Sequence, residues 1–138
     1  QYNQARIYAE TMVSTIHEPL LVLHADFTIR SANKSFYNTF SLTEKETLGK
    51  DLFQLQKNSW NVPGLKEYLL KSQEQNEQSL ERELTHTLPS IGKRTISFNA
   101  RPMKEEDGRR LILLALDDVT LRKEAEKIQD FQKLKLIL

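Results

Sequence analysis

The sequence predicts an α+β domain in which a five-stranded antiparallel sheet carries helices on one face. Two strongly apolar runs, LLVL at 20–23 and LILLAL at 111–116, lie far apart in the chain and suit the centre of one sheet. Short capped helices follow the first run, and alternating strands precede the second. This separation of helices from strands along the chain is typical of the α+β class.

The bulk composition is that of an ordinary single domain. The chain has 138 residues, 28% of them charged, with a net charge of +1. Neither nucleic acid nor an anionic membrane surface is therefore an expected partner. No apolar run approaches the roughly 20 residues of a membrane span, and no signal peptide is visible.

The chain contains no cysteine, which excludes disulfides, thiolate nucleophiles and cysteine-based zinc sites. This fits a reducing compartment, so we expect a cytoplasmic domain whose parent protein can still be membrane-anchored. Because the first residue is Gln rather than Met, we also expect a fragment of a longer protein.

Residues 1–18 predict an N-terminal helix that Pro19 ends. Two interpretations stay open: the helix packs on its own domain, or it pairs with a second copy in a homodimer. Two heptads are too few to decide between them. The apolar residues recur three and four apart, as in a coiled-coil seam: Tyr2, Ala5, Ala9, Met12 and Ile16.

The strand at 20–23 opens a hairpin, with Ala25 and Asp26 in its turn. The second strand, 27–32, alternates apolar and polar residues, which predicts a half-exposed strand. The residues expected to share one face are Phe27, Ile29 and Ser31.

Polar side chains mark the starts of the first helical segments. Asn33 is a natural N-cap for a helix that ends at Phe40. Thr43 and Glu46 have the spacing of a capping box, and Asp51 suits the start of a further turn.

A loop is predicted at 57–60, followed by a longer helix. Asn61 would cap this helix and Pro63 would lie in its first turn, where a missing N–H costs little. The polar run 72–79 is predicted as a surface connection.

Three strands follow the helices. Residues 80–88 alternate, so Leu84, His86 and Leu88 share one face, and residues 94–102 alternate again. We expect the most apolar strands at the centre of the sheet and the charged strands at its edges. The predicted strand order is therefore 2-1-5-4-3.

Asp117, Asp118, Val119 and Thr120 lead from the last strand into a final helix. Together with the free apolar end of the chain, the stripe on this helix predicts a contact with a partner or with the next part of the parent chain. The stripe consists of Leu121, Ala125, Ile128, Phe131 and Leu134.

This pattern resembles the PAS sensor-domain family over about residues 14–124. The matching pieces are LHADFTIRSANKSF, LGKDLFQL and LLALDDVTLRKEAE, and the last contains the family's Asp-Val-Thr-x-Arg-Lys exit signature. The loop at 60–63 is similar to PAS domains of bacterial histidine kinases and chemotaxis-type receptors. His24 and Leu121 depart from the usual Asp and Glu. The division implied is an N-terminal helix at 1–18, a PAS core at 19–118 and a signalling helix at 119–138.

The resemblance implies a non-catalytic module of a two-component or similar signalling protein. In such modules a ligand, cofactor or partner acts between the sheet and the helices, and the exit helix carries the response to an effector domain. Asp118 and Thr120 would then form a signalling joint. The simpler interpretation is that both residues only cap the helix.

If the domain has a ligand pocket, its lining should come from the residues that any core would need. A filled core without ligand is the simpler interpretation, so no cofactor is predicted. The candidate lining is Phe36, Phe40, Leu52, Leu55, Trp60, Leu65, Leu69, Leu84, His86, Ile96 and Phe98.

Haem and flavin are the alternatives weighed for that pocket. His86 is a candidate haem ligand, but the long helix that carries the ligand in haem-binding relatives has no histidine here. Trp60 is a candidate for stacking on a non-covalent flavin, although a core tryptophan is the better explanation. The cysteine-dependent photoreceptor subgroups are excluded. No metal site, phosphate-binding loop or catalytic triad is predicted, so a small α+β enzyme is the weakest hypothesis.

Overall fold

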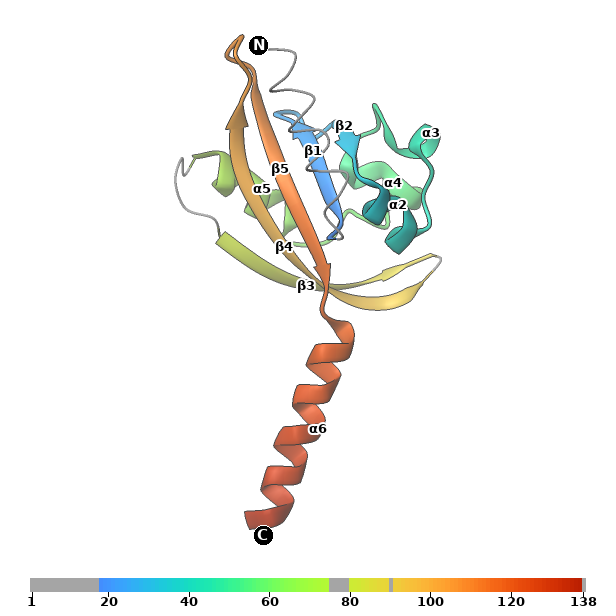
Figure 1. Ribbon diagram of the computed structural model, residues 1–138, viewed down its shortest axis with the longest axis vertical. Coiled ribbons are helices and arrows are strands. Elements are labelled where there is room, and N and C mark those ends of the chain that lie inside the picture. Colours follow the sequence, from blue (N-terminus) through green and yellow to red (C-terminus); the bar gives the residue numbers. More distant parts are fainter. Residues whose placement is uncertain (1–17, 75–79, 90, 138) are drawn as a thin grey trace.

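The computed structural model describes residues 18–74, 80–89 and 91–137 (Figure 1). Its five antiparallel strands have the order β2-β1-β5-β4-β3, which confirms the predicted order. The strands are β1 (Leu20–His24), β2 (Ile29–Ala32), β3 (Leu80–Leu88), β4 (Gly92–Lys104) and β5 (Arg110–Asp118). The proposed N-terminal seam lies outside the described residues.

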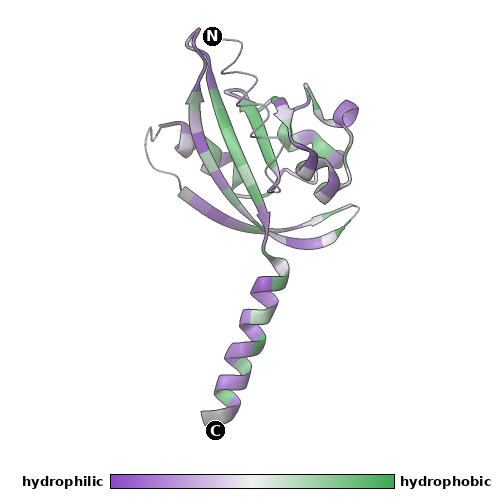
Figure 2. Ribbon diagram, in the orientation of Figure 1, coloured by the Kyte–Doolittle hydropathy of each residue, from purple (hydrophilic) through white to green (hydrophobic). Residues whose placement is uncertain are grey.

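The two most apolar strands, β1 and β5, pair side by side at the centre of the sheet. Leu21 lies opposite Leu114, and Leu23 opposite Ile112. These four side chains are buried in the main hydrophobic core. Their burial explains why the two runs meet, although about ninety residues of chain separate them. The apolar centre of β5 stands out in Figure 2.

A β-bulge corrects the prediction for the second strand. Leu23 pairs with Ile29 but Val22 pairs with Ser31, so Arg30 is the extra residue. Beyond the bulge the side chains change face. Ile29 is buried whereas Ser31 is exposed, so the prediction that they share a face was wrong.

The first three helical segments begin at their predicted caps. Asn33 accepts a hydrogen bond from the Phe36 N–H at 3.0 Å. Thr43 and Asp51 cap the next two segments in the same way. The segments are α2 (Lys34–Phe40), α3 (Glu44–Thr47) and the 3₁₀ turn η1 (Leu52–Gln54).

The next two helices differ from the prediction. The short α4 (Leu55–Asn58) replaces the first part of the expected loop, and its last three residues have positive φ. The following helix, α5 (Leu65–Glu74), begins only after Gly64, whose φ of +92° is not helical. Asn61 and Pro63 therefore precede the helix instead of capping it.

The end of α5 also departs from the expected surface connection. Ser72 lies within the helix, is 1% exposed, and donates a hydrogen bond to the Leu69 carbonyl. A short polar side chain that bonds its own helix can be buried at little cost, which composition alone does not reveal.

The final helix, α6 (Thr120–Ile137), extends away from the sheet (Figure 1). Of the other helices, α5 packs against β4 and β3, α2 contacts β1, and α3 contacts the edge strand β2. Among the described helices, none is long and apolar enough to cross a bilayer.

Candidate functional site

The candidate pocket residues come together in one cluster between the sheet and helices α2 to α5. Nine of the eleven belong to the buried core, Leu84 is partly buried against it, and His86 contacts Trp60. The sequence therefore predicted which residues meet. They are also the residues that hold the fold together, so their role in ligand binding stays a prediction.

Trp60 lies at the centre of an aromatic group. Its ring centroid is 5.0 Å from that of Phe40, 6.0 Å from Phe36 and 5.5 Å from His86. Its indole N–H donates to the Gln56 side-chain oxygen at 3.0 Å. Because Trp60 is fully buried and its donor is satisfied, packing alone accounts for it. A flavin or a haem at this position would have to displace these rings.

His86 is the one unusual member of the cluster. Both ring nitrogens are buried, and neither has a hydrogen-bond partner among the residues that the structure describes. Burial lowers the pKa of His86 below its usual value, so the imidazole is neutral near pH 7. A neutral imidazole carries one donor and one acceptor, and leaving both unpaired is costly. His86 therefore places a polar side chain with unpaired ring nitrogens beside the apolar residues of the cluster.

Tyr68 connects α5 to β4 at the middle of the sheet. Its hydroxyl donates to the Phe98 carbonyl at 3.1 Å and accepts from the Ala100 N–H at 2.9 Å. Burial raises the pKa of the Tyr68 phenol, which keeps its proton for the donated bond. No local pattern in the sequence indicates these two hydrogen bonds, because they join residues thirty or more positions apart.

The junction between β5 and α6 is a polar network. Asp118 accepts from the Thr120 N–H at 3.1 Å and from the Thr120 hydroxyl at 2.6 Å. The Thr120 hydroxyl oxygen in turn accepts from the Thr95 N–H at 2.8 Å. The Val119 N–H donates to the Thr95 carbonyl at 2.9 Å. The start of α6 is therefore bonded to β4 as well as capped.

Two ion pairs at this junction were not anticipated from the sequence. Arg94 on β4 lies 3.5 Å from the Asp118 carboxylate, and Lys123 on α6 lies 3.1 Å from Glu83 on β3. The hydrogen bond and charge of Glu83 raise the pKa of Lys123. The pairs join residues on separate strands and helices, so no local spacing in the sequence indicates them.

The apolar stripe of α6 is exposed in this single chain. The exposed fractions are 75% for Leu121, 58% for Ile128, 64% for Phe131 and 59% for Leu134. Figure 2 shows hydrophobic segments recurring along an otherwise hydrophilic helix. Such a stripe on a projecting helix is typical of a surface that a partner covers.

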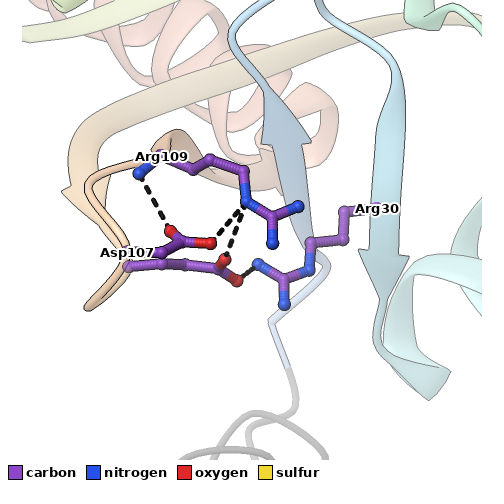
Figure 3. A network of polar contacts seen from close by, with 4 residues as sticks. Arg30, Asp107 and Arg109 are labelled. Atoms are coloured by element: carbon purple, nitrogen blue, oxygen red, sulfur yellow. Dashed lines mark hydrogen bonds and ion pairs between the residues drawn. The ribbon is translucent and has the colours of Figure 1, made fainter.

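A second polar cluster lies at the opposite end of β5, at the turn that joins it to β4 (Figure 3). Arg30 on β2 pairs with Glu105, and the Arg109 side chain lies 2.6 Å from Asp107. The hydrogen bonds from Arg109 lower the pKa of Asp107. The cluster links the β4–β5 turn to β2.

The described residues contain no group of three or more histidine or acidic side chains that could hold a metal ion. His86 and His24 are therefore not parts of a multidentate site within those ranges. The cluster, the junction and the exposed stripe are the features from which a function can be argued.

Comparison with known proteins identifies the family. A family model described as "PAS fold" matches residues 13–124. The chain belongs to the PAS fold family. A search of curated protein sequences found no match.

Solved PAS domains have the same fold. A PAS domain from a two-component sensor histidine kinase is 10% identical, with a TM-score of 0.66 over 86% of this chain and 99% of that one. The PAS domain of Bordetella pertussis BvgS is 20% identical, with a TM-score of 0.65 over 98% and 99%.

A protein described as a Light-Oxygen-Voltage receptor is also among the structural neighbours. An RNA-binding Light-Oxygen-Voltage receptor is 16% identical, with a TM-score of 0.73 over 98% of this chain and 38% of that one. At these identities the likeness shows the fold alone. The family model and these neighbours therefore agree on the PAS fold.

Proposed function

We propose that this PAS domain is a non-catalytic, cytoplasmic sensor and dimerisation module of a bacterial signalling protein, of the histidine-kinase type. In this proposal residues 19–118 form the sensing core and residues 119–138 form the output helix. Residues 1–18 add a second contact with the partner copy. The effector domain would follow α6 in the parent chain.

The observation that carries the proposal is the exposed stripe on α6. Leu121, Ile128 and Phe131 are spaced so that they share one side of the helix, and each is more than half exposed. Most of the stability of a helix in a protein comes from packing of its apolar face, so a projecting helix gains stability when a partner covers that face. A second α6 supplies a matching stripe in a two-fold dimer.

The junction supports a role for α6 in transmitting a signal. Thr120 bonds both Asp118 and the backbone of Thr95, so movement of β4 relative to β5 would strain the start of α6. A signal acts only through different affinities for two arrangements of the domain. Asp118 and Thr120 are the residues at which these arrangements would differ most.

A second candidate, a sensor that holds haem or flavin in its core, is favoured by one observation. The two unpaired nitrogens of His86 would gain a partner from a polar ligand beside Trp60. The chain has no cysteine for a covalent flavin bond, so a flavin would be held non-covalently. The absorption spectrum of freshly purified protein distinguishes the candidates, because only bound haem or flavin absorbs visible light.

Sedimentation equilibrium of the full 138-residue chain tests the dimer. We expect a reversible dimer at micromolar concentration. Phe131→Ser should weaken this dimer, because it removes a large apolar contact between the two helices. Lys133→Ser is the matched control, because residue 133 lies on the opposite side of the same helical turn.

The outcomes separate clearly. A dimer that Phe131→Ser weakens and Lys133→Ser leaves unchanged supports the proposal. A strictly monomeric chain, or equal effects of the two substitutions, contradicts it. Circular dichroism of both variants confirms that α6 is still helical.

A further inference from the structure

Three consecutive residues between the 3₁₀ turn η1 and helix α5 have a left-handed backbone conformation. Gln56, Lys57 and Asn58 have φ values of 50°, 57° and 66°. Asn adopts this conformation comparatively easily, whereas Gln and Lys rarely do, because the Cβ atom then approaches the following carbonyl oxygen. Left-handed residues other than glycine normally occur singly. This segment, here called the left-handed turn, is therefore strained.

The chain on either side of the left-handed turn is anchored in the core. Leu55, immediately before the turn, is 3% exposed, and Trp60, two residues after it, is fully buried. Lys57 and Asn58 are themselves exposed. Strained backbone of this kind persists only where the surrounding structure holds it. The burial of Leu55 and Trp60 therefore maintains the strain, and release of Trp60 would relieve it.

The Gln56 side chain joins the left-handed turn to other parts of the domain. Its amide nitrogen donates to the Phe40 carbonyl at 3.2 Å, and its amide oxygen accepts from the Trp60 indole N–H at 3.0 Å. The Gln56 carbonyl accepts from the Ser59 hydroxyl at 2.6 Å, a bond that stays within the same segment. A single amide side chain thus connects the turn both to the end of α2 and to the tryptophan.

Trp60 links the left-handed turn to His86. The two rings are in edge-to-face contact, with centroids 5.5 Å apart. Both His86 nitrogens are buried without a hydrogen-bond partner among the described residues, and hydration would supply the missing partners. Displacement of the Trp60 indole would therefore relieve the backbone strain and let water reach His86 in one movement.

From this arrangement we propose that the left-handed turn is a gate. In its opening, Gln56 releases the Phe40 carbonyl, the turn relaxes, and Trp60 leaves its place, which exposes the His86 nitrogens to water and to small polar solutes. The strands and α5 stay folded. Because strain is released and two buried nitrogens gain partners, this opening costs less free energy than the packing of Trp60 alone suggests. It is independent of the α6 dimer.

Hydrogen exchange of the Trp60 indole N–H, followed by NMR, measures the opening, and Trp60 is the only tryptophan in the chain. Glycine adopts positive φ freely, so Lys57→Gly should stabilise the closed turn and slow the exchange by about threefold or more. Lys57→Ala is the matched control, because it removes the same charge and side chain but keeps the Cβ atom. Its exchange rate should stay within about twofold of that of the unmodified protein.

Modification of His86 by diethylpyrocarbonate, located by peptide mass spectrometry, measures access to its nitrogens. We expect the modification rate to decrease in Lys57→Gly by the same factor as indole exchange. It should increase in Gln56→Leu, which removes both side-chain hydrogen bonds of the gate. The partly exposed His24 on β1 is the internal reference, and its modification rate should be the same in all variants.

Three results would each overturn the proposal. Equal exchange rates in Lys57→Gly and Lys57→Ala would show that backbone strain does not govern the opening. If indole exchange depended on urea concentration as steeply as global unfolding does, the core would open only as a whole. If His86 modification did not follow indole exchange across the variants, Trp60 would not control access to His86.

Discussion

Helices α5 and α6 both carry apolar stripes, but the domain buries only one of them. In α5, Leu65 and Leu69 are fully buried against the sheet and Tyr68 is 3% exposed. In α6, Ile128 and Phe131 are more than half exposed. Each fully buried apolar side chain contributes roughly 1.5–3 kcal/mol to folding. The α5 stripe therefore stabilises the domain, whereas the α6 stripe is available to a partner.

The largest expected effect is in α5. Leu69→Ala should lower the free energy of unfolding by about 2–5 kcal/mol, because it leaves a cavity in the core. Chemical denaturation followed by tryptophan fluorescence measures this, since Trp60 belongs to the same core. Ile128→Ala in α6 is the matched control and should change the stability of the monomer by less than about 0.5 kcal/mol. If both variants lost similar amounts of unfolding free energy, the claim that only the α5 stripe stabilises the domain would be wrong.

Tyr68→Phe should cost about 1–3 kcal/mol, because the Phe98 carbonyl and the Ala100 N–H both lose their partner while buried. Urea denaturation measures the loss. Tyr37→Phe serves as the comparison, because Tyr37 is only partly buried, and it should have a smaller effect. If Tyr68→Phe left the free energy of unfolding unchanged, apolar packing alone would hold α5 on the sheet.

Asp118→Ala should cost about 1 kcal/mol through the loss of the cap at the start of α6. Asp118→Asn keeps an oxygen acceptor, so it should retain most of the stability that Asp118→Ala loses. Hydrogen exchange distinguishes the two roles of the residue. If Asp118 only caps the helix, faster exchange stays within the first turn of α6. If it is also a signalling joint, exchange changes in β4 near Thr95 as well.

The smallest effect expected is a pH dependence from His86. Because burial lowers its pKa in the folded chain, protons bind preferentially to the unfolded chain as the pH falls below the usual histidine value of 6.5. Stability from this group is therefore constant above that pH and decreases below it. The decrease between about pH 7 and pH 5 should be absent in His86→Leu. An identical decrease in both proteins would mean that other groups cause it.

The sequence predicted the sheet order because LLVL and LILLAL are too apolar to be exposed, and only adjacent central positions bury both. It predicted the caps because Asn33, Thr43 and Asp51 act on backbone groups two or three residues away. Interactions of this range are visible in a local pattern. The strand faces of Ile96 and Phe98 follow from the same alternation.

Other features depend on contacts that no local pattern contains. The bulge at Arg30 is set by the pairing of β2 with β1, so the face of Ser31 could not be read from alternation. The delayed start of α5 depends on the positive φ of Gly64. The ion pair between Glu83 and Lys123 joins two elements forty residues apart. The juxtaposition of Lys104 and Arg110 follows from the register in which β4 pairs with β5.

The pairing of two α6 stripes is the central claim, and disulfide cross-linking tests it most directly. The chain contains no cysteine, so Ile128→Cys or Lys133→Cys introduces a single thiol per chain. A disulfide needs Cα atoms within roughly 7 Å of each other, a distance that only residues facing the partner can reach. The account predicts rapid cross-linking of Ile128→Cys and slow cross-linking of Lys133→Cys under mild oxidation. Equal rates, or faster cross-linking of Lys133→Cys, would contradict it.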